Sequence, residues 1–339
     1  MKQYRLISCL ISCLSACVYS SLILAAEPNV YGADQLEYYL YQGFHSPADG
    51  QRHRLNHIGI AGEQTADGFL VTAVLQGYPA HAAGLNRGDI ITTVNGIPFH
   101  PVFAFNDKDR APADLEPNSL RFEMDISRNN QNLELSVTPV FENLYDSYRS
   151  ATVQSVQEFS SGNKTIGYLQ AWFLSRSTAD LISLQQLLEG LAHCDGLIVD
   201  LRGSYGFLDT QHLRMFGATV EAPVSGQESY PVPIDPYRKP IALLIDSSTR
   251  GAAEKLAAEL DEAERIITLG EVTAGLLGGF AAVNESSLEY LPSTGEGRSG
   301  QLTEGSGLVP EQSVPYPASE SRRDDPQFET AVTLLLGVI

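Results

Sequence analysis

Lysine is scarce in this sequence of 339 residues, where it occurs at five positions: Lys2, Lys108, Lys164, Lys239 and Lys255. Lysine and arginine together number 22 against 41 aspartate and glutamate residues, so the formal net charge is −19 at pH 7. Nonspecific nucleic-acid binding needs clustered basic residues to neutralise phosphates. The composition therefore argues against a nucleic-acid partner, while 43% hydrophobic and 19% charged residues are typical of a globular protein.

Cysteine is nearly absent after residue 17, because three of the four lie near the N-terminus: Cys9, Cys13 and Cys17. The fourth, Cys194, has no partner in the rest of the chain, so no disulfide can form there. It follows an apolar helical pattern and precedes a strand-like run, which indicates a buried thiol. Its neighbours His193 and Asp195 are expected to point away from it and make a poor catalytic triad.

Recognisable metal and phosphate motifs are also lacking. The first four histidines have no ligand-like spacing: His45, His53, His57 and His81. No glycine-rich phosphate-binding loop is present either. We therefore expect no metal and no cofactor.

The first 26 residues carry two charges, Lys2 and Arg5, and are otherwise mostly apolar, which is typical of an export signal. Three forms of processing are open. The segment is cleaved after Ala26, or the box LSAC at residues 14–17 marks Cys17 for lipidation, or residues 6–26 stay as an anchor just long enough to span a bilayer. Each form exports the rest of the chain to the periplasm or cell envelope, and the second anchors it through lipid.

Short apolar runs and turns dominate the sequence from residue 57, after a helical pattern at residues 34–43. The run IITTV at residues 90–94 ends in Asn-Gly, the pattern of a strand closed by a tight turn. Residues 120–126 and 133–140 are expected to form a hairpin that turns at Asn129-Asn130. Residues 102–117, between these elements, are polar and show no helical pattern.

Two motifs in this region resemble a PDZ domain. The run GYPAHAAGL at residues 77–85 is similar to the family's helix motif G-x-P-A-x-x-A-G-L, and RGD at residues 87–89 is similar to its x-G-D turn. The helix that normally flanks the bound peptide is not evident in residues 102–117.

PDZ domains bind a peptide as an added strand at a sheet edge, while a loop captures the terminal carboxylate through backbone N–H groups. The resemblance implies that this loop consists of His57, Ile58, Gly59 and Ile60. Gly59 would then allow close approach, and Ile58 and Ile60 would line a pocket. Alternatively, the two isoleucines are core residues of a strand.

Apolar strands alternate with helical patterns in the second half of the chain. The sequence predicts strands at residues 165–169, 240–245 and 265–270, another within residues 196–203, and helices at residues 179–192 and 251–260. This alternation predicts parallel βαβ units with helices covering a sheet. Asp200, at the end of one strand, is expected to pair with Arg202 or to cap the turn.

This half resembles the catalytic domain of the carboxy-terminal processing, or tail-specific, serine proteases. The run GLIVDLRGSYG at residues 196–206 is similar to the family's G-x-I-x-D-L-R-x-N-x-G-G segment, and GEVTAG at 270–275 is similar to its G-E-x-T-x-G turn. GLVPE at 307–311 and DPQF at 325–328 correspond to its G-x-x-P-D and D-P-Q-L signatures.

The resemblance implies an α/β crotonase-like domain, with the superhelical βα units of the ClpP/crotonase fold, preceded by a small, mostly β PDZ domain. We divide the chain accordingly into a signal segment (residues 1–26), a lead-in (27–54), a PDZ domain (55–141) and a tail-specific-protease-like domain (142–339).

The residues that carry catalysis in this family are replaced here. The family's Ser nucleophile lies in S-A-S-A-S-E, and the matching run STRGAAE at residues 248–254 has Gly251 in its place. The family's Lys base lies in T-F-G-K-G-x-x-Q, and TAGLLGGF at residues 273–280 has Leu276 for the Lys and Phe280 for the orienting Gln.

No nearby residue restores the missing base, because Lys, Arg and His are absent between Arg265 and Arg298. The oxyanion-loop region, which contains Gly203 and Gly206, keeps one of the family's paired glycines. A Ser–Lys dyad needs both members, since either alone is nearly inert.

Three hypotheses about function follow. The first is a catalytically inactive pseudoprotease that binds extended or C-terminal peptides of other proteins and regulates or scaffolds an active envelope protease. The second is an active serine endopeptidase of the carboxy-terminal processing type, with its nucleophile displaced to one of three hydroxyls: Ser247, Ser248 or Thr249. In it Lys255 is the nearby base, although we expect a solvated Lys255 and hydroxyls that cap the helix. The third is a purely structural envelope protein.

Overall fold

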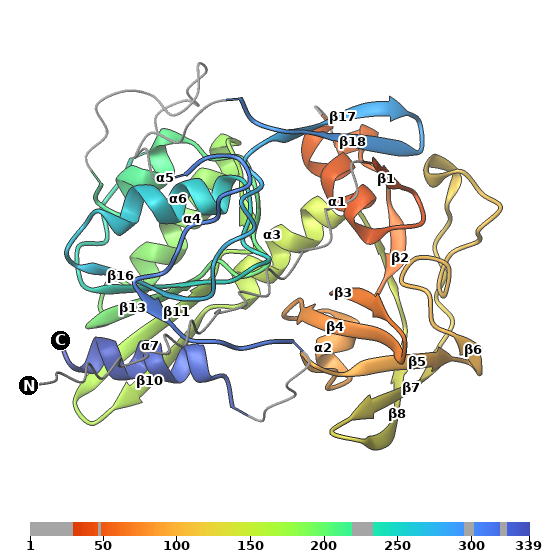
Figure 1. The fold of residues 1–339 in the computed structure, drawn as a ribbon, viewed down its shortest axis with the longest axis horizontal. Helices are drawn as coiled ribbons and strands as arrows, with labels where there is room; N and C mark the ends of the chain where they lie inside the picture. Colours follow the sequence, from red (N-terminus) through yellow and green to blue (C-terminus); the bar gives the residue numbers. More distant parts are fainter. Residues whose placement is uncertain (1–29, 47–48, 219–232, 295–301, 319–323) are drawn as a thin grey trace, which may run out of the picture.

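The structure is a computed structural model in which residues 30–46, 49–218, 233–294, 302–318 and 324–339 are described (Figure 1). The expected export signal, with Cys17 and Ala26, lies outside these ranges. Within them, no helix is both long and apolar enough to cross a bilayer.

The first body, at the right of Figure 1, is an antiparallel sheet with the strand order β3-β4-β5-β7-β8, in which β6 pairs with β5. The strand β3 is at an edge of this sheet. Its helical elements are short, α2 (Pro79–Ala82) and the 3₁₀ turn η2 (Pro112–Asp114). The strands are β3 (Ile60–Thr65), β4 (Gly68–Val74), β5 (Ile90–Val94), β6 (Ile97–Pro98), β7 (Phe122–Arg128) and β8 (Gln131–Val137).

The two turns expected in this body are present, and both use the left-handed backbone region. Asn129 and Asn130, with φ of 52° and 60°, join β7 to β8, while Asn95 and Gly96, with φ of 50° and 75°, join β5 to β6. Two consecutive positive φ values form the hairpin turn that follows the twist of the flanking strands. The motif residue Asp89 is fully buried, and its carboxylate accepts hydrogen bonds from the Arg128 Nε and Nη2, each at 2.6 Å.

The second body is built on a six-stranded sheet with the order β10-β11-β13-β15-β16-β19, parallel except for the antiparallel β10–β11 pair. Its central strands are mostly apolar, with Asp200 at the end of β13 and Thr268 within β16, as expected for a parallel sheet that is covered on both faces. The strands are β10 (Gln157–Ser161), β11 (Lys164–Gln170), β13 (Gly196–Asp200), β15 (Ile241–Ile245), β16 (Ile266–Gly270) and β19 (Gln312–Ser313).

Helices cover both faces of this sheet. One face packs against α4 (Thr178–Gly190) and α6 (Ala252–Asp261), with α5 (Thr210–Met215) beside them, and the other packs against α7 (Pro326–Leu336). Arg202 fastens α7 to the sheet, because its guanidinium contacts Asp200 at 2.5 Å and Asp325 at 2.8 Å. Asp325 also caps α7, so the D-P-Q signature and the pairing expected for Asp200 belong to one structural link.

The lead-in does not stand apart from the second body. Its strand β1 (Val30–Gly32) pairs with β18 (Ser287–Leu291), which forms a hairpin with β17 (Gly279–Asn284). Its helix α1 (Leu36–His45) packs against α3 (Leu144–Gln154), which runs between the two bodies in Figure 1. Two pairs of short strands remain. In the second body, β12 (Phe173–Leu174) pairs with β14 (Tyr205–Gly206), and at the connection between the two bodies, β2 (Leu55–His57) pairs with β9 (Val140–Glu142).

Candidate functional site

Gly251, which matches the nucleophile position, lies at the N-cap of α6, directly after the turn that follows β15. Its backbone has φ of 60° and ψ of −115°, a region that strains residues with a side chain. A methyl group there would lie 3.7 Å from the Leu276 carbonyl oxygen, which is ordinary van der Waals contact. The backbone conformation, and not lack of space, is what favours glycine at this position.

The buried side chain of Glu254 brings the nucleophile and base positions together. Its carboxylate accepts hydrogen bonds from the Gly251 N–H at 3.0 Å and the Leu276 N–H at 3.1 Å. It also accepts bonds from the Gly275 N–H and the Thr273 hydroxyl, both at 2.6 Å. Burial raises the pKa of Glu254, and these donors oppose the increase.

Gly251 and Leu276 are also in direct backbone contact, with the Gly251 N–H donating to the Leu276 carbonyl at 2.9 Å. The two positions that the family's motifs assign to nucleophile and base are therefore adjacent in space. One has no side chain, and the other has an aliphatic side chain that cannot accept a proton.

Leu276 packs against an aromatic cover, which is formed by side chains from the lead-in and the second body. Phe280, at the position of the orienting Gln, stacks on Tyr41 of α1 with ring centroids 3.8 Å apart and an interplanar angle of 17°. Within the described structure, the buried Tyr41 hydroxyl has no hydrogen-bond partner. The members of the aromatic cover are Tyr31, Tyr41, Phe44, Tyr205, Phe280 and Tyr290.

Two of the three hydroxyls considered as displaced nucleophiles, those of Ser248 and Thr249, form hydrogen bonds that stabilise the turn before α6. Ser248 Oγ donates to Asp246 at 2.5 Å and accepts from the Gly203 N–H at 2.8 Å. Thr249 is fully buried, and its hydroxyl bonds to the Leu201 carbonyl at 3.1 Å, while Ser247 is exposed. These hydroxyls do not cap α6 as expected, because Gly251 occupies the N-cap.

Lys255 is not the solvated side chain that the sequence suggested. It is half-buried, and its ammonium donates to the Leu277 carbonyl at 2.9 Å. Burial lowers its pKa. The sequence could not reveal this contact, because it depends on how the segment after Leu276 folds back over α6.

Both glycines of the oxyanion-loop region have positive φ, but several N–H groups of this region are already hydrogen-bonded within the fold. Gly203 and Gly206 have φ of 69° and 143°, and a side chain at Gly206 would overlap the Leu174 carbonyl. The Gly203 N–H bonds to Ser248, and those of Tyr205 and Phe207 bond to the carbonyls of residues 172 and 174. These three amides are therefore already engaged in holding the fold.

The loop predicted to capture a peptide carboxylate is also tightly integrated. His57 is in β2, Ile58 is 1% exposed in the core of the first body, and Ile60 begins β3 half-buried. Gly59 has φ of 78°, and a side chain there would overlap Tyr78. The burial of Ile58 agrees with the alternative that it is a core residue, while close approach of a peptide at Gly59 stays a prediction, and Ile60 with the β3 edge is the more accessible part of the loop.

His57 belongs to a buried network that no sequence pattern indicates. Its Nδ1 accepts the Gly59 N–H at 3.1 Å, so the neutral ring carries its proton on Nε2 and donates to Ser147 Oγ at 3.1 Å. Ser147 in turn donates to Glu142 at 2.8 Å, as does the Tyr78 hydroxyl at 2.6 Å. Burial lowers the pKa of His57 to about 3. The network joins the first body to α3. Here the histidine donates to the serine, whereas in a Ser–His catalytic pair the serine donates its proton to the histidine.

Comparison with known proteins matches each half of the chain separately. Residues 165–311 match the model of peptidase family S41, and residues 70–102 match that of the PDZ domain. The carboxy-terminal processing protease CtpA of Bacillus subtilis (strain 168) is 27% identical over 231 residues, which cover 64% of this chain and 46% of that protein. The chain therefore spans about half the length of this curated relative.

Two solved structures are similar in fold. A protein from Bacteroides fragilis assigned to the S41 proteases has a TM-score of 0.53 at 17% identity, covering 85% of this chain and 84% of its own. The photosystem II D1 C-terminal processing protease has a TM-score of 0.46 at 16% identity, covering 78% and 74%. The first comparison agrees with the family matches on a mixed α/β peptidase fold joined to a strand-rich PDZ region.

Proposed function

Since the chain contains a PDZ domain and a domain of peptidase family S41, we propose that it is an exported pseudoprotease. It binds extended or C-terminal peptide segments, and it regulates or scaffolds proteolysis by an active protease of the cell envelope. The observation that carries this proposal is the direct backbone contact of Gly251 with Leu276, whose side chain packs against the aromatic cover.

Two features of the family site support the loss of catalysis. A Ser–Lys dyad works because an unprotonated amine takes the proton of the attacking hydroxyl. Neither group is available at Gly251 and Leu276, and the N–H groups of Gly203, Tyr205 and Phe207 are already bonded within the fold. Together these features remove the nucleophile, the base and much of the stabilisation of a developing oxyanion.

The edge of β3 supports the peptide-binding half of the proposal. An edge strand presents N–H and C=O groups that another extended chain can pair with, and PDZ domains use this mode of recognition. Glu63 and Gln64, near the end of β3, are exposed, and the described part of residues 99–121 contains only the short turn η2 in place of a flanking helix. Binding through this edge therefore relies on main-chain pairing with β3 more than on contacts with a helix on the other side of the peptide.

The catalytic part is tested with a fluorophosphonate probe and an unstructured protein substrate. We expect neither labelling nor cleavage by the wild-type protein. Half-buried Lys255, whose pKa is lowered by burial, is the one observation that favours a displaced active site. Labelling that Ser248→Ala abolishes and Lys255→Ala weakens would establish that alternative and overturn the pseudoprotease proposal.

The binding part is tested with two neighbouring proline variants, Glu63→Pro and Gln64→Pro, and fluorescently labelled C-terminal peptides. Successive residues of an antiparallel edge strand point their N–H groups alternately toward the paired strand and toward solvent. One variant therefore loses an outward N–H and should lose binding with little change in stability, while the other loses a sheet hydrogen bond and stability.

Each proline variant serves as the control for the other. Equal binding by both folded variants and the wild type would exclude the β3 edge as the peptide site. Repeating the titration with C-terminally amidated peptides separates carboxylate capture from pairing along an internal segment.

A further inference from the structure

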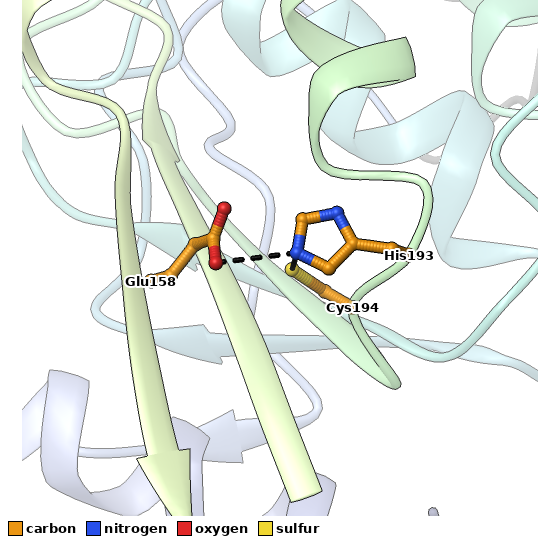
Figure 2. Close-up of side chains that lie close together, drawn as sticks. All are labelled: Glu158, His193 and Cys194. Carbon is orange, nitrogen blue, oxygen red and sulfur yellow. Dashed lines mark hydrogen bonds and ion pairs between the residues drawn. The ribbon is translucent and has the colours of Figure 1, made fainter.

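A cluster of three side chains lies at the end of the molecule away from the first body. Glu158 comes from β10, and His193 and Cys194 come from the turn after α4 (Figures 1 and 2). His193 Nε2 lies 3.2 Å from Glu158 Oε2 and 3.8 Å from Cys194 Sγ. One ligand atom of each residue lies within 4.8 Å of the other two.

The fold brings these side chains together at a position where the sheet has no side chain. Glu158 pairs directly with Gly167 across the β10–β11 ladder, so their side-chain positions share a face. A methyl group at Gly167 would lie 3.3 Å from Cys194 Sγ. The glycine thus leaves room in which the thiol of Cys194 and the carboxylate of Glu158 approach the same ring.

The backbone of this turn is fixed by hydrogen bonds to neighbouring segments, and this allows two consecutive side chains to converge. The Lys239 ammonium donates to the Cys194 carbonyl at 2.7 Å and to the His193 carbonyl at 3.3 Å. The Asp195 N–H donates to the Thr165 carbonyl at 2.7 Å, which ties the end of the turn to the start of β11. The expectation that His193 and Cys194 point away from each other is therefore wrong.

The hydrogen bond of the other ring nitrogen determines what His193 offers to the cluster. Nδ1 lies 3.0 Å from the Gly190 carbonyl oxygen, which can only accept, so Nδ1 carries a proton. In the neutral ring, Nε2 then presents its lone pair toward Glu158 and Cys194. A backbone carbonyl that orients a histidine in this way is the usual outer partner of a metal-binding imidazole.

We propose that Glu158, His193 and Cys194 form a binding site for a zinc-like divalent transition-metal ion. Three electron-pair donors of different kinds converge there, and a cation is what satisfies them together. The nitrogen, sulfur and oxygen donor set is the one that Zn²⁺ prefers, whereas Mg²⁺ and Ca²⁺ prefer oxygen alone.

Two of the three separations between ligand atoms agree with this assignment. Zinc bonds of about 2.0–2.3 Å in a tetrahedral arrangement separate neighbouring ligand atoms by roughly 3.3–3.7 Å, close to the two distances from Nε2. The side chains of His193 and Glu158 are 59% and 48% exposed, so a fourth, solvent-facing position stays open for water or a further ligand. The site thus has the open form of zinc centres with three protein ligands.

Metal binding also replaces a proton on sulfur. Burial and the nearby charge of Glu158 raise the pKa of the Cys194 thiol. The bound metal ion takes the place of the thiol proton, which passes to solvent, so binding should release a proton and strengthen as the pH rises.

The experiment uses the full chain with Cys9, Cys13 and Cys17 each replaced by Ser, so that Cys194 is its sole thiol. Titration with Co²⁺, a coloured substitute for Zn²⁺, should give one site per chain and a near-ultraviolet thiolate-to-cobalt absorption band that Zn²⁺ then removes by competition. Cys194→Ser should abolish the band. Glu158→Gln should weaken binding at least about tenfold, because losing even an outer partner of a metal ligand typically costs 10–100-fold.

Asp195→Asn and Glu158→Gln together make the outcome decisive. Asp195→Asn changes a neighbouring carboxylate outside the cluster and should leave the affinity unchanged. Glu158→Gln alters an exposed side chain, so it keeps the fold even if Cys194→Ser does not. Absence of the thiolate band in the folded protein, or equal Co²⁺ affinity for the parent and Glu158→Gln, would overturn the proposal in favour of a simple His193–Glu158 ion pair beside a neutral thiol.

Discussion

The sequence motifs single out two turns, one in each body of the molecule. Each turn is held by its own buried titratable side chain. Glu254 holds the turn at Gly251 and Leu276, and His57 holds the turn at Gly59. They differ in the direction of their pKa shifts, because burial raises the pKa of the acid and lowers that of the base.

The opposite shifts give opposite contributions to stability as the pH changes. His57 contributes stability that is present above its unfolded pKa of 6.5 and is lost as the pH falls toward 3. Glu254 contributes stability that is present below its unfolded pKa of 4.5 and is lost as the pH rises through its higher folded value. The comparison teaches that backbone N–H groups of both turns bond within the protein, those of Gly251 and Leu276 to Glu254 and that of Gly59 to His57.

Removing the Glu254 carboxylate should have the largest effect. In Glu254→Ala, the Gly275 and Leu276 N–H groups and the Thr273 hydroxyl lose their buried acceptor, while the Gly251 N–H keeps its bond to the Leu276 carbonyl. We expect the free energy of unfolding to fall by about 4 kcal/mol, since each unsatisfied buried donor costs about 1–3 kcal/mol and the cost of burying the acid is relieved. Denaturant titration measures it, with the exposed Glu262→Ala at the end of α6 as a control that should change stability by less than about 0.5 kcal/mol.

The glycine of the first domain should be less replaceable than that of the second. In Gly59→Ala, the new methyl group would overlap the Tyr78 side chain in addition to straining the backbone, so we expect a loss of about 3 kcal/mol in unfolding free energy. Because Tyr78→Gly also removes a buried side chain and its hydrogen bond to Glu142, the comparison is made as a cycle: Gly59→Ala should cost less in the Tyr78→Gly background than in the wild type, by the part due to overlap. Chemical denaturation of the single and double variants distinguishes the two.

The His57 network should give the protein a measurable loss of stability in mild acid. Between pH 6.5 and pH 5, the lowered pKa of His57 should decrease the free energy of unfolding by about 2 kcal/mol. Burial lowers the pKa of His212 to about 4, so it adds a similar slope. Denaturant titrations across this range should show a slope that is smaller by about one proton in His57→Gln than in the wild type, and an unchanged slope would contradict the assignment.

Gly251→Ala should have the smallest effect of the four. The added methyl group meets only the Leu276 carbonyl oxygen, so the cost is the strain of positive φ, about 1–2 kcal/mol. Gly190→Ala, in the last turn of α4 with open space around it, is the matched control and should be neutral or slightly stabilising. A loss at residue 251 as large as that at residue 59 would mean that the turn is closed by packing rather than by backbone conformation.

The sequence predicted local features well wherever a motif fixes the backbone. The helices expected at residues 34–43, 179–192 and 251–260 correspond to α1, α4 and α6, and β5 has the expected bounds. The helix α3 was missed because tyrosine, serine and alanine give it a weak apolar pattern, although its buried residues face both α1 and the His57 network.

Contacts between distant segments could not be predicted in the same way. Nothing in the motif around Phe280 indicates that Tyr41 of the lead-in stacks on it, because that contact depends on β1 pairing with β18. The burial of Lys255 could not be predicted for the same reason, since the carbonyl that its ammonium contacts belongs to Leu277 in another loop. Glu158 joins His193 and Cys194 only through the packing of β10, so no ligand spacing reveals the cluster.

The pairing of β2 with β9 also determines how the molecule responds to mechanical force. The chain passes into the PDZ domain through Leu55 and out through Glu142, and these two residues are partners in the ladder. Tension across this connection therefore opens one residue pair after another, like a zipper, instead of shearing all pairs together. A force on the β3 edge would reach the second body in part through this three-pair ladder.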